Sequence, residues 1–184
     1  SLLEQYPNAR YRASVPDEAA PVDRCDSSMT WRRPGIEADS LHPSSALPYM
    51  GNDSSCVISI GTGNAMLLPG DISRVVEHRL LLDGLSPHRV LLVPHHGSAT
   101  SSSAAFIERV DPEVAIATAG LGNRFNFPRP EIRGRYQDLG VTFWSTGECG
   151  AIRLWLHRDG GLDAISARRA RNRIWRWPAG ANCP

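Results

Sequence analysis

Lysine is missing from this sequence, because all twenty basic residues are arginine. Without a lysine amine the chain can form no Schiff base and has no lysine-dependent phosphate loop. No run approaches about 18 consecutive apolar residues, so no segment predicts a membrane span. Cysteine is scarce, and its spacing lacks the C-x-x-C pairs of a zinc finger. Disulfides are compatible with a location outside the cytoplasm, and the sequence leaves their pairing open among Cys25, Cys56, Cys149 and Cys183.

Charge is balanced overall but not along the chain. The net charge is +1, yet residues 153–184 hold seven arginines and two acids, and the other 152 residues carry a net of −4. Near the end arginine alternates with tryptophan, a pattern that can hold phosphates and stack bases. The alternative is a solvated segment with tryptophan docked on the core. We expect one domain over 1–166 and a basic tail over 167–184. The candidate nucleic-acid contacts of the tail are Arg168, Arg169, Arg171, Arg173, Trp175 and Arg176.

Turn residues are frequent, with 16 glycines and 14 prolines, which indicates many short elements. Helices are predicted at 74–84, 101–110 and 130–139. The first has Ser73 as its cap and four apolar residues on or near one face: Val75, Val76, Leu80 and Leu81. Strands are predicted at 35–43, 56–60, 65–68, 89–93, 113–118, 141–145, 151–157 and 162–166. Two pairs of these strands are expected to form hairpins, 56–60 with 65–68 and 151–157 with 162–166. This order predicts a layered α/β fold.

Two polar clusters follow predicted strands. A Gly-Asp turn places Asp71 after the strand 65–68, and a carboxylate there suits a hard or borderline cation. A turn carboxylate or a helix cap is the alternative role. His95 and His96 follow the strand 89–93. Adjacent side chains point in different directions, so one faces a given site and the other is a second ligand, a proton shuttle or a structural hydrogen-bonding group.

A third cluster is the loop 120–128, which follows the strand 113–118. Asn123 and Arg124 offer an amide and a guanidinium, which suit an anion such as phosphate. A plain loop with the arginine paired to an acid explains this cluster equally well. Because strand ends converge on one rim in layered α/β folds, the three clusters predict a single metal-dependent, phosphate-directed site.

Three motifs resemble, in order and spacing, those of the ComEC family of competence proteins, which bring DNA across the inner membrane. They are LLPGDI at 67–72, VPHHGS at 93–98 and GNRF at 122–125. Further matches are WRRPGI at 31–36, NDSSCV at 52–57 and GAI at 150–152. The resemblance covers roughly residues 1–157.

The resemblance implies a soluble C-terminal domain with the metallo-β-lactamase fold, an αββα sandwich that holds two divalent ions, zinc or manganese. In that fold the Gly-Asp carboxylate bridges the metals, which makes Asp71 a ligand. A later histidine binds the second metal, and His96, 25 positions after Asp71, is favoured over His95. His95, the expected catalytic residue, then faces the scissile phosphate or orients the site. The expected substrate contacts are Ser98, Asn123 and Arg124.

By the same resemblance, metal-bound hydroxide attacks a phosphodiester, and the domain degrades the DNA strand that is not imported. The expected partners are this single-stranded DNA, the transmembrane channel region of the same protein and other competence proteins. We expect an inner-membrane parent whose soluble domain faces the periplasm.

Two features differ from the family pattern. The main metal motif, His-x-His-x-Asp-His, is absent, and no histidine precedes His42. In the family that motif lies just upstream of a segment like residues 1–7, so we expect an N-terminally truncated sandwich that binds metal poorly and hydrolyses nothing alone. Phe127 stands where we expect many relatives to carry histidine. The alternatives are a non-catalytic DNA-binding domain of the same transporter, another metallo-β-lactamase-fold phosphoesterase, or a scaffold whose histidine pair is structural.

Overall fold

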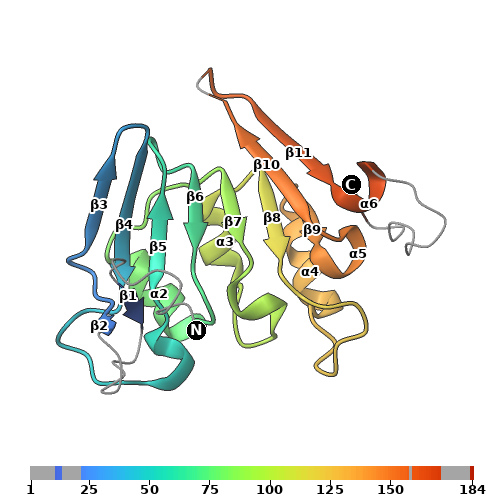
Figure 1. Ribbon diagram of the computed structural model, residues 1–184. Coiled ribbons are helices and arrows are strands. Elements are labelled where there is room, and N and C mark those ends of the chain that lie inside the picture. The colour runs from blue at the N-terminus through green and yellow to red at the C-terminus, as the bar shows by residue number, and fades with distance from the viewer. Residues whose placement is uncertain (1–10, 14–21, 158, 171–182) are drawn as a thin grey trace.

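A computed structural model describes residues 11–13, 22–157, 159–170 and 183–184, and it confirms the expected α/β class (Figure 1). A mixed seven-stranded sheet has the order β3-β4-β5-β6-β7-β8-β9. Its strands are β3 (Thr30–Arg33), β4 (Ile36–His42), β5 (Val57–Ile60), β6 (Met66–Leu68), β7 (Val90–Leu92), β8 (Val114–Ala117) and β9 (Thr142–Ser145). Two separate pairs are β1 (Tyr11–Ala13) with β2 (Val22–Arg24) and β10 (Ile152–Leu156) with β11 (Leu162–Ser166).

The central sheet changes from antiparallel to parallel at β6. Strands β3 to β6 are antiparallel neighbours, whereas β6 to β9 run parallel and are joined through helices. The helices are α2 (Arg74–Leu82), α3 (Ala104–Val110), α4 (Pro130–Asp138), α5 (Thr146–Cys149) and α6 (Ala167–Ala170). Because parallel strands end at the same edge of a sheet, the segments after β6, β7 and β8 gather along the lower edge in Figure 1.

The predicted helices α2 and α3 are present, with two corrections. Ser73 caps α2 as predicted, since its Oγ accepts a hydrogen bond from Val75 N. The Val75 side chain is 75% exposed while Val76 is buried, because the helical period turns Val75 away from the core. Helix α3 begins at Ala104, later than predicted, because Ser102 has a φ of +58° that a right-handed helix does not allow. Strands β1, β2 and β3 and the short helices α5 and α6 were not predicted.

The main hydrophobic core lies between the central sheet and the helices α2, α3 and α4. Its largest fully buried side chains include Leu67, Leu91, Phe106, Ile107, Ile132 and Tyr136. A second cluster lies on the opposite face, where the β10–β11 hairpin packs against Val90, Ile116 and Trp144. Along β7, β8 and β9, alternate side chains thus face the helices on one side of the sheet and the hairpin on the other.

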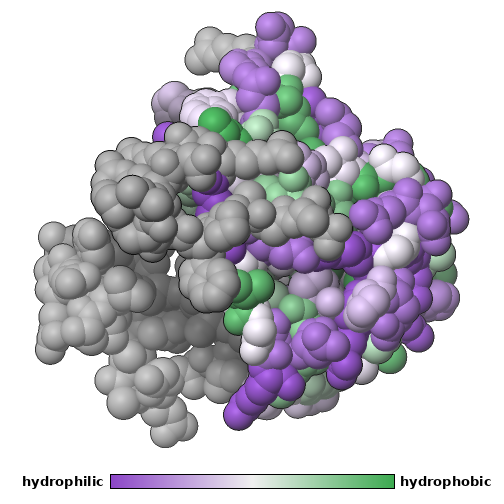
Figure 2. All heavy atoms as spheres, turned by 90° about the vertical axis from the view of Figure 1, so that its right-hand side faces the viewer, coloured by the Kyte–Doolittle hydropathy of each residue, from purple (hydrophilic) through white to green (hydrophobic). Residues whose placement is uncertain are grey.

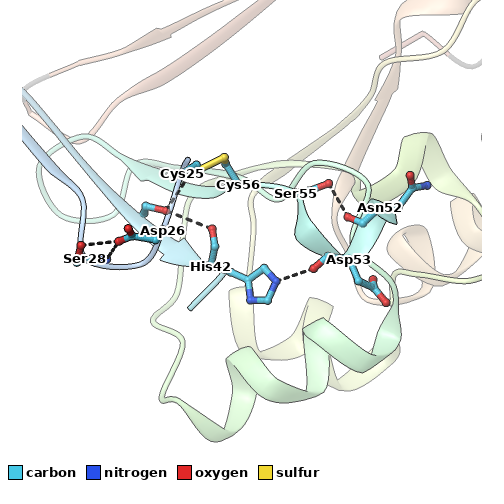
Figure 3. Close-up of a disulfide and its surroundings, with 9 residues drawn as sticks. Cys25, Asp26, Ser28, His42, Asn52, Asp53, Ser55 and Cys56 are labelled. Carbon is cyan, nitrogen blue, oxygen red and sulfur yellow. Dashed lines mark hydrogen bonds between the residues drawn. A yellow bond between two sulfur atoms is a disulfide. The ribbon is translucent and has the colours of Figure 1, made fainter. Parts of the chain in front are cut away.

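Two disulfides supply the pairing that the sequence left open. Cys25 is bonded to Cys56, 31 positions away, with their Cα atoms 6.0 Å apart (Figure 3). Cys149 is bonded to Cys183, 34 positions away, with their Cα atoms 5.4 Å apart. The first disulfide joins the segment before β3 to the start of β5, and the second lies in the hydrophobic cluster beneath the β10–β11 hairpin.

One face of the molecule shows its hydrophobic residues in small groups (Figure 2). On the side of the molecule shown in Figure 2, described residues are mostly hydrophilic, with separate hydrophobic spots. Among the described residues, no helix is both long enough and apolar enough to cross a membrane. Single exposed apolar side chains are ordinary in globular proteins, so only a local group of them indicates a binding surface.

Candidate functional site

Asp71 and His96 meet at the lower edge of the central sheet. Asp71 follows β6, and His96 lies in η2 (Pro94–Gly97), the turn after β7. The Asp71 Oδ1 and His96 Nε2 atoms are 3.4 Å apart, and the two side chains are 37% and 45% exposed, so solvent reaches both. The other ring nitrogen, His96 Nδ1, lies 3.0 Å from Oγ1 of Thr118, which follows β8. Three consecutive parallel strands therefore each bring one side chain to the same place.

The backbone at the histidine pair has an uncommon conformation. His95 and His96 have φ values of +48° and +56°, two consecutive left-handed residues that are not glycine. Each such residue costs about 1–2 kcal/mol, and strain of this kind gathers at functional sites. Here His95 N donates to Gly70 O at 3.0 Å, and Ser98 N donates to His95 O at 2.9 Å. The histidine turn is thus tied to the Gly-Asp turn that carries Asp71.

The two histidine rings make different contacts, as expected for adjacent side chains. His95 Nδ1 lies 3.3 Å from Thr100 Oγ1, and its Nε2 lies 3.4 Å from Asn52 Nδ2. The His95 ring also meets the Phe127 ring edge-on, with centroids 6.0 Å apart. His95 therefore lies between the turn 51–54 and the loop after β8.

Asp53 and Ser55 hold the segment that carries Asp71, a role that the sequence did not predict. Ser55 Oγ accepts a hydrogen bond from Asp71 N at 3.1 Å. The Asp53 carboxylate accepts from Ser73 N and Ser73 Oγ at 2.7 and 2.9 Å. The only signal was the polar motif NDSSC, whose Asn, Asp and Ser side chains favour backbone-bonding turns (Figure 3). Its partner could not be identified from local pattern, because the Ser55–Asp71 contact spans 16 positions.

A buried carboxylate anchors the segment that follows the histidine turn. Glu77 on α2 is fully buried and accepts hydrogen bonds from Ser102 N and, at 2.9 Å, from Ser103 N. The Tyr136 hydroxyl on α4 donates to Ser102 Oγ at 3.1 Å. Burial raises the pKa of Glu77, and the backbone hydrogen bonds act against this rise. Burial likewise raises the pKa of Tyr136. Helices α2 and α4 thus hold the start of α3 in place.

The three expected phosphate contacts differ in what their side chains do. Ser98 is buried, and its Oγ lies 3.0 Å from Thr100 Oγ1. The Asn123 amide donates to Gly120 O at 2.9 Å and to Phe127 O at 2.6 Å, and its oxygen accepts from Phe127 N at 3.0 Å. Arg124 is exposed and lies over the Phe125 ring, 4.6 Å from its centroid. Ser98 and Asn123 therefore hold their own loops, and Arg124 is the group open to an anion.

The proposed nucleic-acid tail is described only at its beginning. Arg168 Nη1 donates to Gly147 O at 2.9 Å and to Glu148 O at 3.1 Å, so this guanidinium is already engaged with α5. The predicted boundary after residue 166 falls at the start of α6, which directly follows β11. The side chain of Arg169 lies outside the described part of the chain, as do Arg171, Arg173, Trp175 and Arg176.

The Asp71–His96 pair fits part of a divalent-metal site. At zinc–ligand distances of about 2.0–2.1 Å, neighbouring donors of a tetrahedral site lie about 3.3 Å apart, close to the 3.4 Å between Oδ1 and Nε2. The contact of His96 Nδ1 with Thr118 resembles the outer hydrogen bonds that orient histidine ligands, with Nε2 as the atom that would face a metal ion. Such a site has about four or more ligands, and within the described ranges no three His, Cys, Asp or Glu side chains gather as a ligand set. Among the described residues the pair thus offers two donors, fewer than such a site needs.

Comparison with known proteins places the chain beside competence proteins. No protein-family model matches it. Competence protein ComA of Neisseria gonorrhoeae is 31% identical over 174 residues, which cover 93% of this chain and 24% of ComA. Recombination protein 2 of Haemophilus influenzae is 29% identical over 182 residues, 97% of this chain and 22% of that protein. ComE operon protein 3 of Bacillus subtilis is 31% identical over 116 residues, 61% of this chain and 15% of that protein.

The chain spans about a quarter or less of the length of these relatives, with shares of 24%, 22% and 15%. Their names are those of ComEC-type proteins, in agreement with the motifs at Asp71, at the histidine pair and at Asn123. The chain is homologous to one part of several larger proteins that carry ComEC-family names.

Proposed function

We propose that this chain is part of a DNA-uptake protein of the ComEC type and that Asp71 and His96 hold a divalent metal ion in a phosphodiesterase site. The observation that carries the proposal is the 3.4 Å approach of Asp71 Oδ1 to His96 Nε2 at a turn with two left-handed histidines. The biological setting comes from the relatives, one of which is named competence protein ComA. The proposed task is degradation of the DNA strand that is not imported.

The proposed fold around this site is a metallo-β-lactamase-like αββα sandwich. Helices cover one face of the central sheet, and on the other face of β5 and β6 the apolar side chains are only half-buried. These side chains are Ile58, Ile60, Met66 and Leu68. A second β-sheet on this face would remove the remaining apolar surface from water, which stabilises by about 1 kcal/mol per half-buried side chain. We expect other residues of the longer protein to form that layer.

The chain's own residues have separate roles in the proposed reaction. A divalent ion, when bound, lowers the pKa of a coordinated water and polarises a phosphoryl oxygen. Asp71 and His96 would hold it, and Thr118 orients the His96 ring. His95 would face the scissile phosphate from the same turn. Arg124 would bind a neighbouring phosphate through charge-assisted hydrogen bonds.

The two disulfides support the proposed periplasmic side of an inner-membrane parent. In bacteria disulfides form and persist in the oxidising periplasm and are rare in the reducing cytosol. All four cysteines of this chain are paired. The transmembrane channel region of the same protein and the other competence proteins are the proposed neighbours of this part.

Cleavage of a single-stranded oligonucleotide by the full-length protein with Mn²⁺ or Zn²⁺ tests the proposal. Asp71→Asn and His96→Gln are expected to lower kcat/KM more than about 100-fold, because loss of a ligand costs more than loss of its outer hydrogen bond. Asp163→Asn is the matched control, since Asp163 Oδ2 contacts His157 Nε2 at 2.8 Å on the β10–β11 hairpin. Cleavage by Asp71→Asn at the wild-type rate would overturn the assignment.

A second candidate function is DNA binding without cleavage by the same part of the transporter. The exposed Arg124 on the Phe125 ring favours it, because a cation beside an exposed aromatic ring suits nucleic acid without any metal. Salt-sensitive binding that survives Asp71→Asn, together with no cleavage by the full-length wild-type protein, would select this candidate over the phosphodiesterase.

A further inference from the structure

The loop after β8 presents two stacked phenylalanine rings beside the histidine turn. The Phe125 and Phe127 centroids are 5.5 Å apart with the rings 21° from parallel, and the Phe125 side chain is 52% exposed. We propose that Phe125 and Phe127 form a base-stacking platform that binds unpaired DNA bases next to the Asp71–His96 pair. This inference rests on the proposed function, because it names the residues that would receive the bases of the single strand at the same site.

The loop is held in one conformation, as a platform requires. The Asn123 side chain makes three hydrogen bonds within it, two of them to the Phe127 backbone. Arg129 N donates to Gly97 O at 2.9 Å, which fastens the loop to the histidine turn. A Cβ at Gly97 would lie 2.5 Å from Pro128 Cβ, so the two segments are in direct contact. Binding a base therefore costs little further ordering of the loop.

Positive charge accompanies the rings. The Arg124 guanidinium lies 4.6 Å from the Phe125 centroid, and that of Arg129 lies 5.8 Å from the Phe127 centroid. Within the described part of the chain neither guanidinium is ion-paired, whereas the nearby Arg133 is paired with Glu148 at 2.9 Å. Proteins that bind single strands combine stacking aromatics with cations that follow the phosphates, and these four residues reproduce that combination.

The platform lies where a bound strand would reach the candidate site. The Phe127 ring is 6.0 Å from the His95 ring, and His95 precedes His96 directly. A hollow of about 350 Å³ lies beside Phe127 and is bordered by Asn126 and Arg133. A base that stacks on the exposed part of the Phe125 ring would thus lie near both Arg124 and the histidine turn. In duplex DNA the base faces are already stacked, so the platform favours single strands.

The test is binding of a fluorescent oligo-dT by the full-length protein in EDTA, so that no metal-dependent cleavage contributes. Phe125→Leu keeps an apolar side chain and removes the ring, and it is expected to weaken binding about 5- to 150-fold, as for loss of one stacked base. Phe125→Trp keeps an aromatic ring at this position, so it should bind oligo-dT about as tightly as the wild type. Trp155→Leu is the matched control, because Trp155 is also an exposed ring with an arginine, Arg153, 5.6 Å from its centroid, and lies on β10.

Substrates without stackable bases complete the test. An abasic oligonucleotide of equal length and a blunt duplex should bind more weakly than oligo-dT, and Phe125→Leu should not change their affinity. The platform is overturned by no binding of oligo-dT at low salt, by equal affinity for the abasic strand, or by equal loss in Trp155→Leu. It is also overturned if Phe125→Leu abolishes binding to anionic lipid vesicles while oligo-dT binding stays. If Asp71→Asn loses metal-dependent cleavage and Phe125→Leu leaves oligo-dT binding unchanged, the phosphodiesterase is retained and the platform is rejected. If Asp71→Asn cleaves at the wild-type rate and Phe125→Leu weakens oligo-dT binding, the platform is retained and the phosphodiesterase assignment is rejected.

Discussion

Polar side chains around the histidine turn fall into two groups: those that bond to the backbone and those that do not. Ser55 and Asn123 bond to backbone atoms and shape the turns that carry Asp71 and Phe127. Asp71 and His96 instead meet each other, and Arg124 stays exposed. Since the same residue types serve in both groups, an amide or serine in a loop does not by itself indicate a substrate contact. Only the geometry separates residues that position the site from residues that would touch a phosphate.

A buried histidine makes the stability of the fold depend on pH. His88 is 3% exposed, its Nδ1 lies 2.8 Å from Ser86 O, and its Nε2 lies 2.8 Å from Ser59 Oγ. Burial lowers the pKa of His88 below its ordinary value of 6.5, although the hydrogen bond to Ser86 acts against this. The folded state therefore favours the neutral ring, whose contribution to stability is present above pH 6.5 and is lost as pH falls toward the lowered pKa.

Urea unfolding between pH 5 and 7.5 tests whether the stability falls as the pH falls. The free energy of unfolding should fall on acidification by at most about 1.4 kcal/mol per pH unit for this one proton. His88→Gln should reduce the slope, while His78→Gln, at an exposed position of α2, should leave it unchanged. Burial also lowers the pKa of His42, so a residual slope of the same sign is expected in His88→Gln. An unchanged slope in His88→Gln would contradict the role given to His88.

At the scale of elements, the contact between the histidine turn and the loop after β8 depends on Gly97. Gly97 has a φ of +87° and no room for a Cβ beside Pro128, whereas Gly122 has a φ of +65° and open space around it. Gly122→Ala should cost about 1–2 kcal/mol for the backbone alone. Gly97→Ala should cost about 1–3 kcal/mol more, because it also overpacks the contact. Thermal unfolding of the two variants measures this difference, and equal losses would mean that the contact adds nothing.

Local pattern was sufficient for the strands and helices that form the edge. The apolar run before Asp71, the run before His95 and the Ser73 cap each followed from the sequence, because their signals lie within a few residues. The start of α3 was placed too early, because the left-handed Ser102 is held by Glu77 from another helix. Strand β3 was not predicted, because it is mostly exposed and has no apolar alternation to mark it.

The sequence likewise predicted only part of the candidate site. That Asp71 and His96 converge followed from their places after neighbouring strands and from the family resemblance. The roles of Ser55 and Thr118 did not follow, because each acts through a contact between distant segments. The stacking of Phe125 on Phe127 was also missed, since ring geometry depends on how Asn123 folds the loop.

At the scale of the whole molecule, two disulfides join segments that are far apart in the sequence. The Cys25–Cys56 bond closes a separation of 31 positions, which gives about 3–4 kcal/mol in the chain-entropy account. The double variant Cys25→Ser with Cys56→Ser should lower the free energy of unfolding by about this amount, as measured in urea. Adding dithiothreitol to the wild type should lower it further, because the Cys149–Cys183 bond is then lost as well. Unfolding insensitive to both changes would show that neither bond contributes to stability.

The metal-binding role of the Asp71–His96 pair is tested most directly by titrating the full-length protein with Mn²⁺ and following the bound ion by electron paramagnetic resonance. The wild type and Asp163→Asn should bind with the same affinity, because Asp163 lies on the β10–β11 hairpin. Asp71→Asn and His96→Gln should each weaken binding more than about 100-fold. Identical titrations of Asp71→Asn and the wild type would contradict the role given to this pair.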